Sequence, residues 1–419
     1  MHALALALVL TSAPKPAVIE DDYGRALVEA KRSRRLLFVD AWAPWCHTCV
    51  FMREHVLNQP SFAAFERDVV FAAIDTEKAS SAAFLDKFPV SVWPTLFFID
   101  PATEAVAFKW VGSADAAQMR ALLDAARRKD ERLSEADALW AQGKATEAAL
   151  KYVDGLAGDP SVRGTLSMLS ALSAARQLLP CARTAAEQAP RLEAASDRIN
   201  AITWGLGCAL ELEAGSQDKA PLTAALARQA SDAVSLEGAL ADDVSGLYEL
   251  LVEERRAAKD DPAAEALARR WLAYLEAAAG AARTPSARAV FDPHRLVAAM
   301  ASKQVERVLA PLEQSERQLP KDFNPSARLA IAFRELKRLP QAEAAIARAL
   351  ARNTGGPRRV RLFEIRASIA AAKGDVAGQR RALSEALSYG RALPASQRPT
   401  RALAALEQQL RDLEPAATK

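Results

Sequence analysis

The sequence predicts a chain of two parts, an α/β domain over residues 19–128 followed by an all-α region over residues 129–419. Before residue 129, short apolar runs typical of buried strands alternate with amphipathic helical segments. After it the strand patterns stop, and Ala, Leu, Arg and Glu recur at helical spacing to the end of the chain. A length of 419 residues is also typical of two or three domains.

The α/β part is predicted to form a small mixed sheet with helices on both faces. Its strand candidates are apolar, bounded by turn residues and only five to seven residues long. The order of the elements implies parallel pairs made by crossovers and one antiparallel hairpin at the end. The expected strands are 36–41, 69–75, 95–99 and 105–111. The expected helices are 23–35, 46–68 with a break at Pro60, 81–88, and one that follows Gly112 and ends at residue 128.

The second part contains an internal repeat. Residues 328–350 align with residues 363–387, with Lys337 and Lys373 in matching positions 36 residues apart. A period in the mid-thirties, made of a helix, a polar turn and a second helix, is typical of tetratricopeptide-like pairs stacked in a solenoid. Residues 138–150 resemble the same unit. Residues 214–320 show no clean repeat, so divergent repeats and an inserted bundle remain equal alternatives.

Composition excludes some partners and suggests a location. The formal net charge of +3 is too small over this length to attract a nucleic acid, and no stretch of about 18 apolar residues predicts a membrane span. Residues 3–10 form an apolar run that ends at small residues, which predicts a signal peptide within residues 1–18 and export, in a bacterium to the periplasm. The alternative is a cytoplasmic protein with an apolar N-terminus.

Cys46 and Cys49 form a C-x-x-C pair. If the four cysteines were placed at random along the chain, the expected number of such pairs would be only about 0.04. A zinc site is disfavoured because His47, His55 and His294 supply no second ligand pair, so no metal is predicted. A purely structural disulfide is disfavoured because so small a loop constrains little of the unfolded chain. Redox catalysis is favoured, because the pair follows a buried strand and begins a helix.

The position of the pair predicts different roles for its members. Cys46, at the helix start, is expected to be exposed and to act as the nucleophile, since the helix dipole stabilises its thiolate. Cys49, one turn later, is expected to be shielded and to resolve the mixed disulfide. His47 and Thr48 are expected to tune the redox potential; the alternative for His47 is an exposed side chain with little effect.

The segment from Val39 to Cys49, VDAWAPWCHTC, and the segment VWPTL around Pro94 resemble the active-site segment and the cis-proline loop of the thioredoxin superfamily. The resemblance covers residues 20–128. It implies a cis Trp93–Pro94 bond facing Cys46 and a redox-active Cys46–Cys49 disulfide with no further cofactor. It also implies a substrate-binding surface and a buried acid that assists the proton transfer of Cys49. The residues implied are Trp45, Trp93, Pro94 and Thr95 for substrate and Asp40 as the acid; the alternative for Asp40 is a solvent-facing strand residue. Phe71 stands where thioredoxins proper carry a buried lysine.

Three further sets of residues stand outside this resemblance. Cys181 and Cys208, 27 residues apart, either bridge adjacent helices or remain buried thiols. His55 and His294 are interpreted as isolated side chains. The arginine-rich segments 358–361 and 380–381 are interpreted as solvated helix faces, with a groove for an acidic partner peptide as the alternative.

Together these observations predict an enzyme, a thiol:disulfide oxidoreductase that acts on protein cysteines as a reductase or electron carrier. Its partners would be proteins that bear thiols or disulfides and an upstream electron donor or acceptor, with the helical repeats binding protein. The alternative function is a non-enzymatic adapter in which the repeats carry the function and the first domain only docks.

Overall fold

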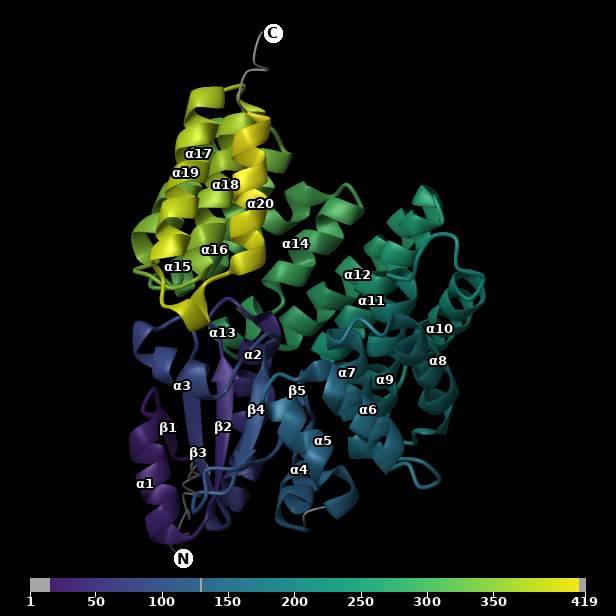
Figure 1. Ribbon diagram of the computed structural model, residues 1–419. Coiled ribbons are helices and arrows are strands. Elements are labelled where there is room, and N and C mark those ends of the chain that lie inside the picture. Colours follow the sequence, from purple (N-terminus) through teal and green to yellow (C-terminus); the bar gives the residue numbers. More distant parts are fainter. Residues whose placement is uncertain (1–15, 129, 414–419) are drawn as a thin grey trace, which may run out of the picture.

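The α/β part forms a five-stranded mixed sheet. The computed structural model describes residues 16–128 and 130–413, and the sheet has the order β1-β3-β2-β4-β5 (Figure 1). β1 and β2 run parallel to β3, whereas β4 runs antiparallel to β2 and to β5. The strands are β1 (Val18–Glu20), β2 (Leu36–Trp42), β3 (Val69–Asp75), β4 (Thr95–Ile99) and β5 (Val106–Val111). The sequence missed β1, because three residues are too few to show an alternating pattern.

Helices cover both faces of this sheet, as predicted. α1 (Tyr23–Ser33) and α3 (Ala82–Lys87) pack on the face that contains Leu37 and Val39, and α2 (His47–Met52) and α4 (Ala116–Arg128) pack on the face that contains Phe38. The helix expected over residues 46–68 is divided. α2 passes into one π-helical turn, and a 3₁₀ helix begins at Pro60, whose ring lacks the amide hydrogen that a continuous helix needs.

The second part is entirely helical over the residues described. α16 and α17 form one antiparallel pair and α18 and α19 the next, with their first helices beginning 34 residues apart, close to the predicted period. The helices are α5 (Glu131–Ala141), α6 (Ala145–Gly155), α7 (Val162–Ala174), α8 (Leu178–Gln188), α9 (Ala195–Leu210), α10 (Lys219–Ala233), α11 (Ala241–Ala257), α12 (Asp261–Ala281), α13 (Pro285–Ala289), α14 (Asp292–Ala301), α15 (Leu309–Gln318), α16 (Asn324–Glu335), α17 (Leu339–Arg352), α18 (Arg358–Ala372), α19 (Val376–Ala392) and α20 (Thr400–Asp412). None of them is long and apolar enough to cross a bilayer.

One hydrophobic core runs from the sheet into the helices. It extends from Phe38 on β2 through Trp110 on β5 and Trp140 on α5 to Ile369 on α18. At the junction, the ammonium group of Lys109 on β5 lies 3.9 Å from the centre of the Trp140 ring. Burial lowers the pKa of Lys109 to about 8. The boundary predicted at residue 128 therefore marks a change of secondary structure within a continuous core.

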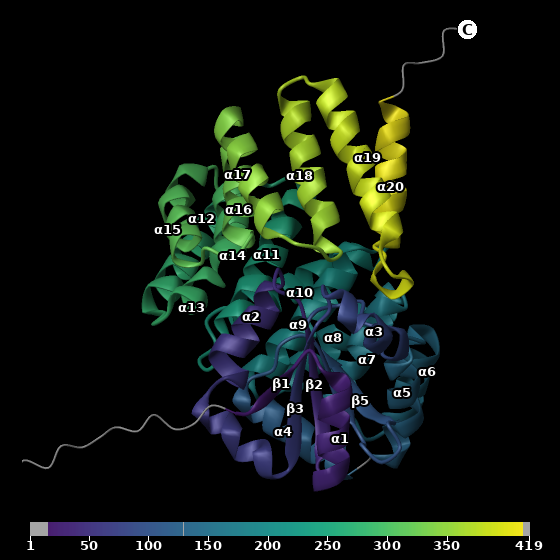
Figure 2. The ribbon, with the colours of Figure 1, turned by 90° about the vertical axis from the view of Figure 1, so that its left-hand side faces the viewer.

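The helical part curves back over the end of the sheet where α2 begins (Figures 1 and 2). α13 and α14 lie beside α2, and the C-terminal helices α15–α20 stand above the α/β part. The short 3₁₀ turn Ala395–Gln397, between α19 and α20, contacts the loop after β3. There the side-chain amide of Gln397 donates to the carbonyl oxygens of Thr76 and Lys78 at 2.9 and 2.8 Å. Segments more than 300 residues apart thus form one surface around the start of α2.

Cys181 on α8 and Cys208 on α9 form a disulfide between neighbouring helices. Both residues are buried. We expect the double substitution Cys181→Ser/Cys208→Ser to lower the free energy of unfolding by about 3 kcal/mol, because the bridge closes a 27-residue loop in the unfolded chain. Urea unfolding of the oxidised proteins measures this difference. An equal free energy of unfolding in both proteins would contradict it.

The predicted signal peptide lies almost wholly outside the described residues, which begin at residue 16. It stays a prediction.

Candidate functional site

The Cys46–Cys49 pair lies where β2 ends and α2 begins. Cys46 is the N-cap residue of α2, and its sulfur accepts a hydrogen bond from the backbone amide of Cys49 at 3.0 Å. The two sulfurs are joined in a disulfide. Cys49 is fully buried, whereas Cys46 is 5% exposed. The burial of Cys49 is as expected, but Cys46 is less exposed than the sequence suggested, because helices of the second part cover it.

The loop before β4 faces this pair. The Trp93–Pro94 peptide bond is cis, and the Trp93 ring packs against Trp45 with ring centres 5.2 Å apart. The indole of Trp93 donates to the hydroxyl of Thr76 at 2.8 Å. The hydroxyl of Thr95 donates to the carbonyl of Val92 at 2.7 Å. Trp45 and Trp93 form a small apolar cluster with the two cysteines, so these predicted substrate-binding residues do lie together.

Cys46 opens onto a cavity of about 530 Å³ between the two parts of the chain. One wall consists of Trp45, Cys46 and the loop around Trp93. The opposite wall is formed by α14, α16 and α18, with the apolar side chains Leu296, Ile331 and Leu362. The side-chain amide of Asn324 on α16 donates to the carbonyl of Pro44 at 3.0 Å and ties this wall to the turn before Cys46. Cys46 is therefore accessible to a molecule bound in this cavity.

Asp40 is buried in β2, which excludes the solvent-facing alternative. It is 3% exposed, and neither of its carboxyl oxygens has a hydrogen-bond partner among the residues described. Burial raises its pKa to about 7, an effect that the charge of Arg53 partly opposes. Phe71 packs against Phe38 and Phe62 in an aromatic cluster, so Arg53 is the cation near this acid.

A cavity of about 20 Å³ adjoins Asp40 and is large enough for one water molecule. Asp40 can therefore exchange a proton near neutral pH.

Comparison with known proteins agrees with this geometry. A family model described as Thioredoxin-like matches residues 18–101. Residues 18–101 form a thioredoxin-like domain. The curated relative Protein disulfide-isomerase 1 of Dictyostelium discoideum is 28% identical over 114 residues, which make up 27% of this chain and 31% of that protein. The chain thus matches about a third of this relative's length.

A solved structure, the TPR2AB-domain:pHSP90-complex of yeast Sti1, is similar over 68% of this chain and 97% of its own, at 13% identity. Its TM-score of 0.27 is too low to support an argument about the fold. The predicted fold class, an α/β thioredoxin-like domain followed by an all-α helical-repeat region, is confirmed; the repeat is visible in the pairs α16–α17 and α18–α19.

The helical region adds two arginines beside the thioredoxin-like disulfide. Arg328 on α16 and Arg358 on α18 both line the cavity at Cys46. The guanidinium of Arg358 lies 4.8 Å from the centre of the Trp45 ring. Burial lowers the pKa of both arginines, that of Arg358 to about 10. Within residues 16–128 and 130–413, neither guanidinium has a hydrogen bond or an ion pair, although Asp292 and Asp322 act on Arg328, and Glu77 and Glu364 on Arg358, from further away. Two cationic side chains therefore line the cavity without a direct partner.

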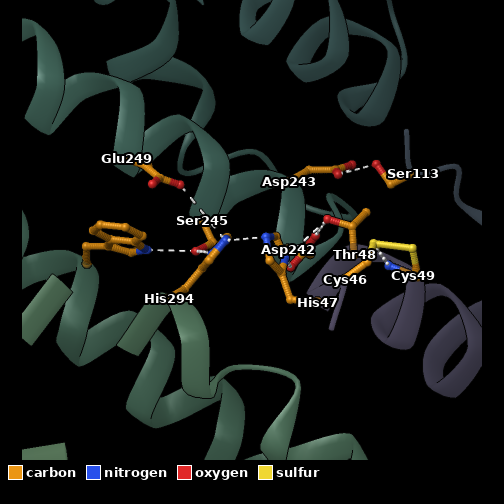
Figure 3. Close-up of polar contacts among 11 residues, drawn as sticks. Cys46, His47, Thr48, Cys49, Ser113, Asp242, Asp243, Ser245, Glu249 and His294 are labelled. Atoms are coloured by element: carbon orange, nitrogen blue, oxygen red, sulfur yellow. Dashed lines mark hydrogen bonds and ion pairs between the residues drawn. A yellow bond between two sulfur atoms is a disulfide. The ribbon is translucent and has the colours of Figure 1, made fainter. Parts of the chain in front are cut away.

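His47 points away from the cysteines toward helices α11 and α14 (Figure 3). Its Nδ1 atom lies 3.0 Å from a carboxylate oxygen of Asp242, and its Nε2 atom lies 3.0 Å from Nε2 of His294. The hydroxyl of Thr48 donates to the same carboxylate at 2.6 Å. Both residues between the cysteines are thus held by the second part of the chain.

The charges within this group are strongly coupled. Burial alone would lower the pKa of His47, but the charge and hydrogen bond of Asp242 raise it. Burial and the charge on His47 lower the pKa of His294 to about 3. Although burial opposes it, the charge on His47 holds the pKa of Asp242 below its usual range. His47 and Asp242 therefore form an ion pair that faces a neutral His294.

Sequence reasoning missed most of this group. The interpretation of His294 as isolated is wrong, since it is buried and contacts His47. No pattern could have paired them, because they are 247 residues apart and each is a lone histidine in its own segment. Asp242 likewise looks like an ordinary acid in the first turn of α11. His55 stacks on Phe51 with ring centres 4.4 Å apart and lies outside this group.

Proposed function

We propose that this protein is a thiol:disulfide oxidoreductase that acts on cysteine-containing polypeptides in the reducing direction. The observation that carries the proposal is the Cys46–Cys49 disulfide at the start of α2, opposite the Pro94 loop and open to the cavity between the two parts of the chain. The similarity to a protein disulfide-isomerase supports the same chemistry. The adapter alternative gives no reason for a C-x-x-C pair in this position.

The proposed reaction has two exchange steps. The Cys46 thiolate attacks a disulfide of the substrate, so that a Cys46–substrate disulfide forms and one substrate thiolate leaves. Cys49 then attacks Cys46, which closes the Cys46–Cys49 disulfide and releases the second substrate thiolate. Two electrons pass to the substrate, and we assign Asp40 as the acceptor of the Cys49 proton. A separate dithiol donor returns two electrons to the pair.

The substitution Cys49→Ala tests this scheme directly. Without Cys49 the second step cannot occur, so a covalent adduct between Cys46 and the substrate is expected to accumulate. Mass spectrometry of the non-reduced protein after incubation with a disulfide-containing peptide measures the adduct. The double variant Cys46→Ser/Cys49→Ala is the matched control and should form none. If the single variant forms no adduct that a reductant removes, the proposed function is wrong.

We further propose that the substrate segment carries an acidic side chain close to its cysteine, which would pair with Arg328 or Arg358. We expect wild-type protein to reduce a peptide with Asp beside the cysteine about tenfold faster, in kcat/KM, than the same peptide with Asn. This ratio corresponds to about 1.5 kcal/mol for a hydrogen bond to a charged group. The double variant Arg328→Gln/Arg358→Gln should abolish the preference while leaving turnover of the Asn peptide similar.

The matched control for that prediction is Arg338→Gln. Arg338 lies just after α16 and pairs with Glu306 at 2.9 Å on the surface, away from the cavity. This variant should keep the wild-type preference. Equal rates for the Asp and Asn peptides in wild-type protein would show that the two arginines do not select the substrate.

The predicted export remains a proposal. The disulfide between Cys181 and Cys208 supports it, because structural disulfides persist in oxidising compartments. N-terminal sequencing of the protein from its native cells tests it, and a mature chain that begins near residue 14 is expected. A chain that begins at Met1 would favour the cytoplasmic alternative.

A further inference from the structure

His47 and His294 lie with one ring nitrogen of each next to the other (Figure 3). Their Nε2 atoms are 3.0 Å apart. The other nitrogen of each ring is held: Nδ1 of His47 by the carboxylate of Asp242 at 3.0 Å, and Nδ1 of His294 by the hydroxyl of Ser245. Ser245 is fixed in turn by the indole of Trp271, which donates to its oxygen at 2.7 Å. The orientation of both rings is therefore set by their surroundings.

Histidines that bind a metal ion have the same arrangement. One ring nitrogen coordinates the ion, while the other donates to a carboxylate, a hydroxyl or a carbonyl that fixes the ring. In a tetrahedral zinc site with zinc–nitrogen bonds of about 2.05 Å, two nitrogen ligands are about 3.3 Å apart. The two Nε2 atoms would have to separate by only a few tenths of an ångström. Asp242, whose carboxylate lies within 4.8 Å of both rings, stands where such an orienting group is expected.

A carboxylate is in position to complete the set. An oxygen of Glu249, one turn after Ser245 on α11, lies 4.0 Å from Nε2 of His294. Among the residues described, Glu249 has no hydrogen-bond partner, and its side chain is 48% exposed. It can therefore turn toward the ring nitrogens and still leave a path to solvent. Two imidazoles and one carboxylate are a donor set suited to zinc and similar transition metals, with a fourth position open to water.

We propose that His47, His294 and Glu249 bind a divalent transition metal ion of the zinc class, with Asp242 and Ser245 as the groups that orient the two histidines. The ligands come from α2, α11 and α14, so a bound ion fastens the turn between the cysteines to the helical region. Metal binding itself does not depend on the proposed exchange reaction.

The competing explanation is a hydrogen bond alone. If protonated His47 donates from Nε2 to Nε2 of His294, and Nδ1 of His294 donates to the oxygen of Ser245, then all four ring nitrogens are satisfied without an ion. Direct measurement of metal binding separates the two explanations.

Isothermal titration of the metal-free, oxidised full-length protein with ZnCl₂ provides the test. In the oxidised form both sulfurs of Cys46 and Cys49 are in a disulfide, so thiolates do not compete as ligands. We expect one Zn²⁺ per chain. His47→Gln and Glu249→Gln should each weaken binding at least tenfold, and Asp242→Asn should weaken it 10- to 100-fold, as for other orienting groups. His47 and Glu249 are both partly exposed, so these two variants should fold.

Matched controls separate the site from general binding. Glu253→Gln removes an exposed carboxylate one turn along α11, and His55→Gln removes a histidine outside the group; both should bind zinc as the wild type does. Co²⁺ in place of Zn²⁺ should give the weak visible bands of nitrogen and oxygen ligation without a sulfur charge-transfer band. The proposal is overturned if wild-type protein binds no stoichiometric zinc, or if His47→Gln and Glu249→Gln bind it unchanged.

Discussion

Replacing Asp40 by Asn is expected to slow turnover at pH 7 by about 10²-fold or more, the range that a general acid–base group contributes. The substitution keeps the size of the side chain but removes the proton-accepting oxygen. Burial holds the pKa of this carboxyl near 7. In the proposed scheme it takes the Cys49 proton in one step and releases it in the next. The charged groups that act on it are Arg53 on the helical segment after α2 and Glu20 on β1. Turnover of a disulfide-containing peptide with a dithiol donor measures the effect.

The same substitution should stabilise the folded protein at alkaline pH. The pKa of Asp40 is about 7 in the folded state against 3.8 for an unperturbed side chain, so the folded state binds the proton more tightly. The free energy of unfolding therefore decreases as the pH rises from about 4 to 7, because the buried carboxyl of the folded protein must lose its proton. Above about pH 7 this destabilisation is fully present. At about 1.4 kcal/mol for each pKa unit, Asp40→Asn should raise the free energy of unfolding at pH 8 by on the order of 4 kcal/mol.

Urea unfolding at pH 4 and pH 8 measures this second effect, and the difference between variant and wild type should be small at the lower pH. Asp86→Asn on the exposed side of α3 is the control and should change neither stability nor turnover. Wild-type turnover in Asp40→Asn, or a stability difference that does not grow with pH, would contradict the assignment of Asp40.

Cys46→Ser is expected to reduce turnover to the uncatalysed rate, whereas Cys49→Ser should still complete the first exchange step. The difference follows from access, because Cys46 lines the cavity between the two parts and Cys49 is fully buried. Serine is close in size to cysteine and is a good N-cap residue, so α2 should start as in the wild type. Stopped-flow measurement of the first exchange step in both variants gives the comparison.

Alkylation of the reduced wild-type protein provides a check that does not depend on a substrate. Iodoacetamide should modify Cys46 before Cys49. Modification in the opposite order, or equal turnover in Cys46→Ser and wild-type protein, would exclude Cys46 as the nucleophile.

The sequence was informative wherever the decisive residues are close together along the chain. Four strands were predicted from apolar runs, and the segments around Cys46 and Pro94 carried the resemblance to the thioredoxin superfamily. Asp40 was included because it lies only six residues before Cys46. These features depend on local spacing, which a sequence displays directly.

The rest of the site depends on how the helical region folds back. Arg328, Asp242 and His294 reach Cys46 or His47 only because α11, α14 and α16 pack over the end of the sheet. Each of these residues belongs to an ordinary amphipathic helix, so its local pattern is that of any helix packed on a core. The spacing of residues along the chain does not predict which distant helices will pack together in this way.

The continuous core has a consequence for the independence of the first domain. A fragment ending at residue 128 would expose to water the side of β5 on which α5 and α7 pack, including Phe108, over which Arg163 lies at 4.7 Å. Such a surface favours self-association. We therefore expect the thioredoxin-like domain to be poorly soluble on its own, and the cavity at Cys46 to exist only in the full chain, because α14, α16 and α18 form its opposite wall.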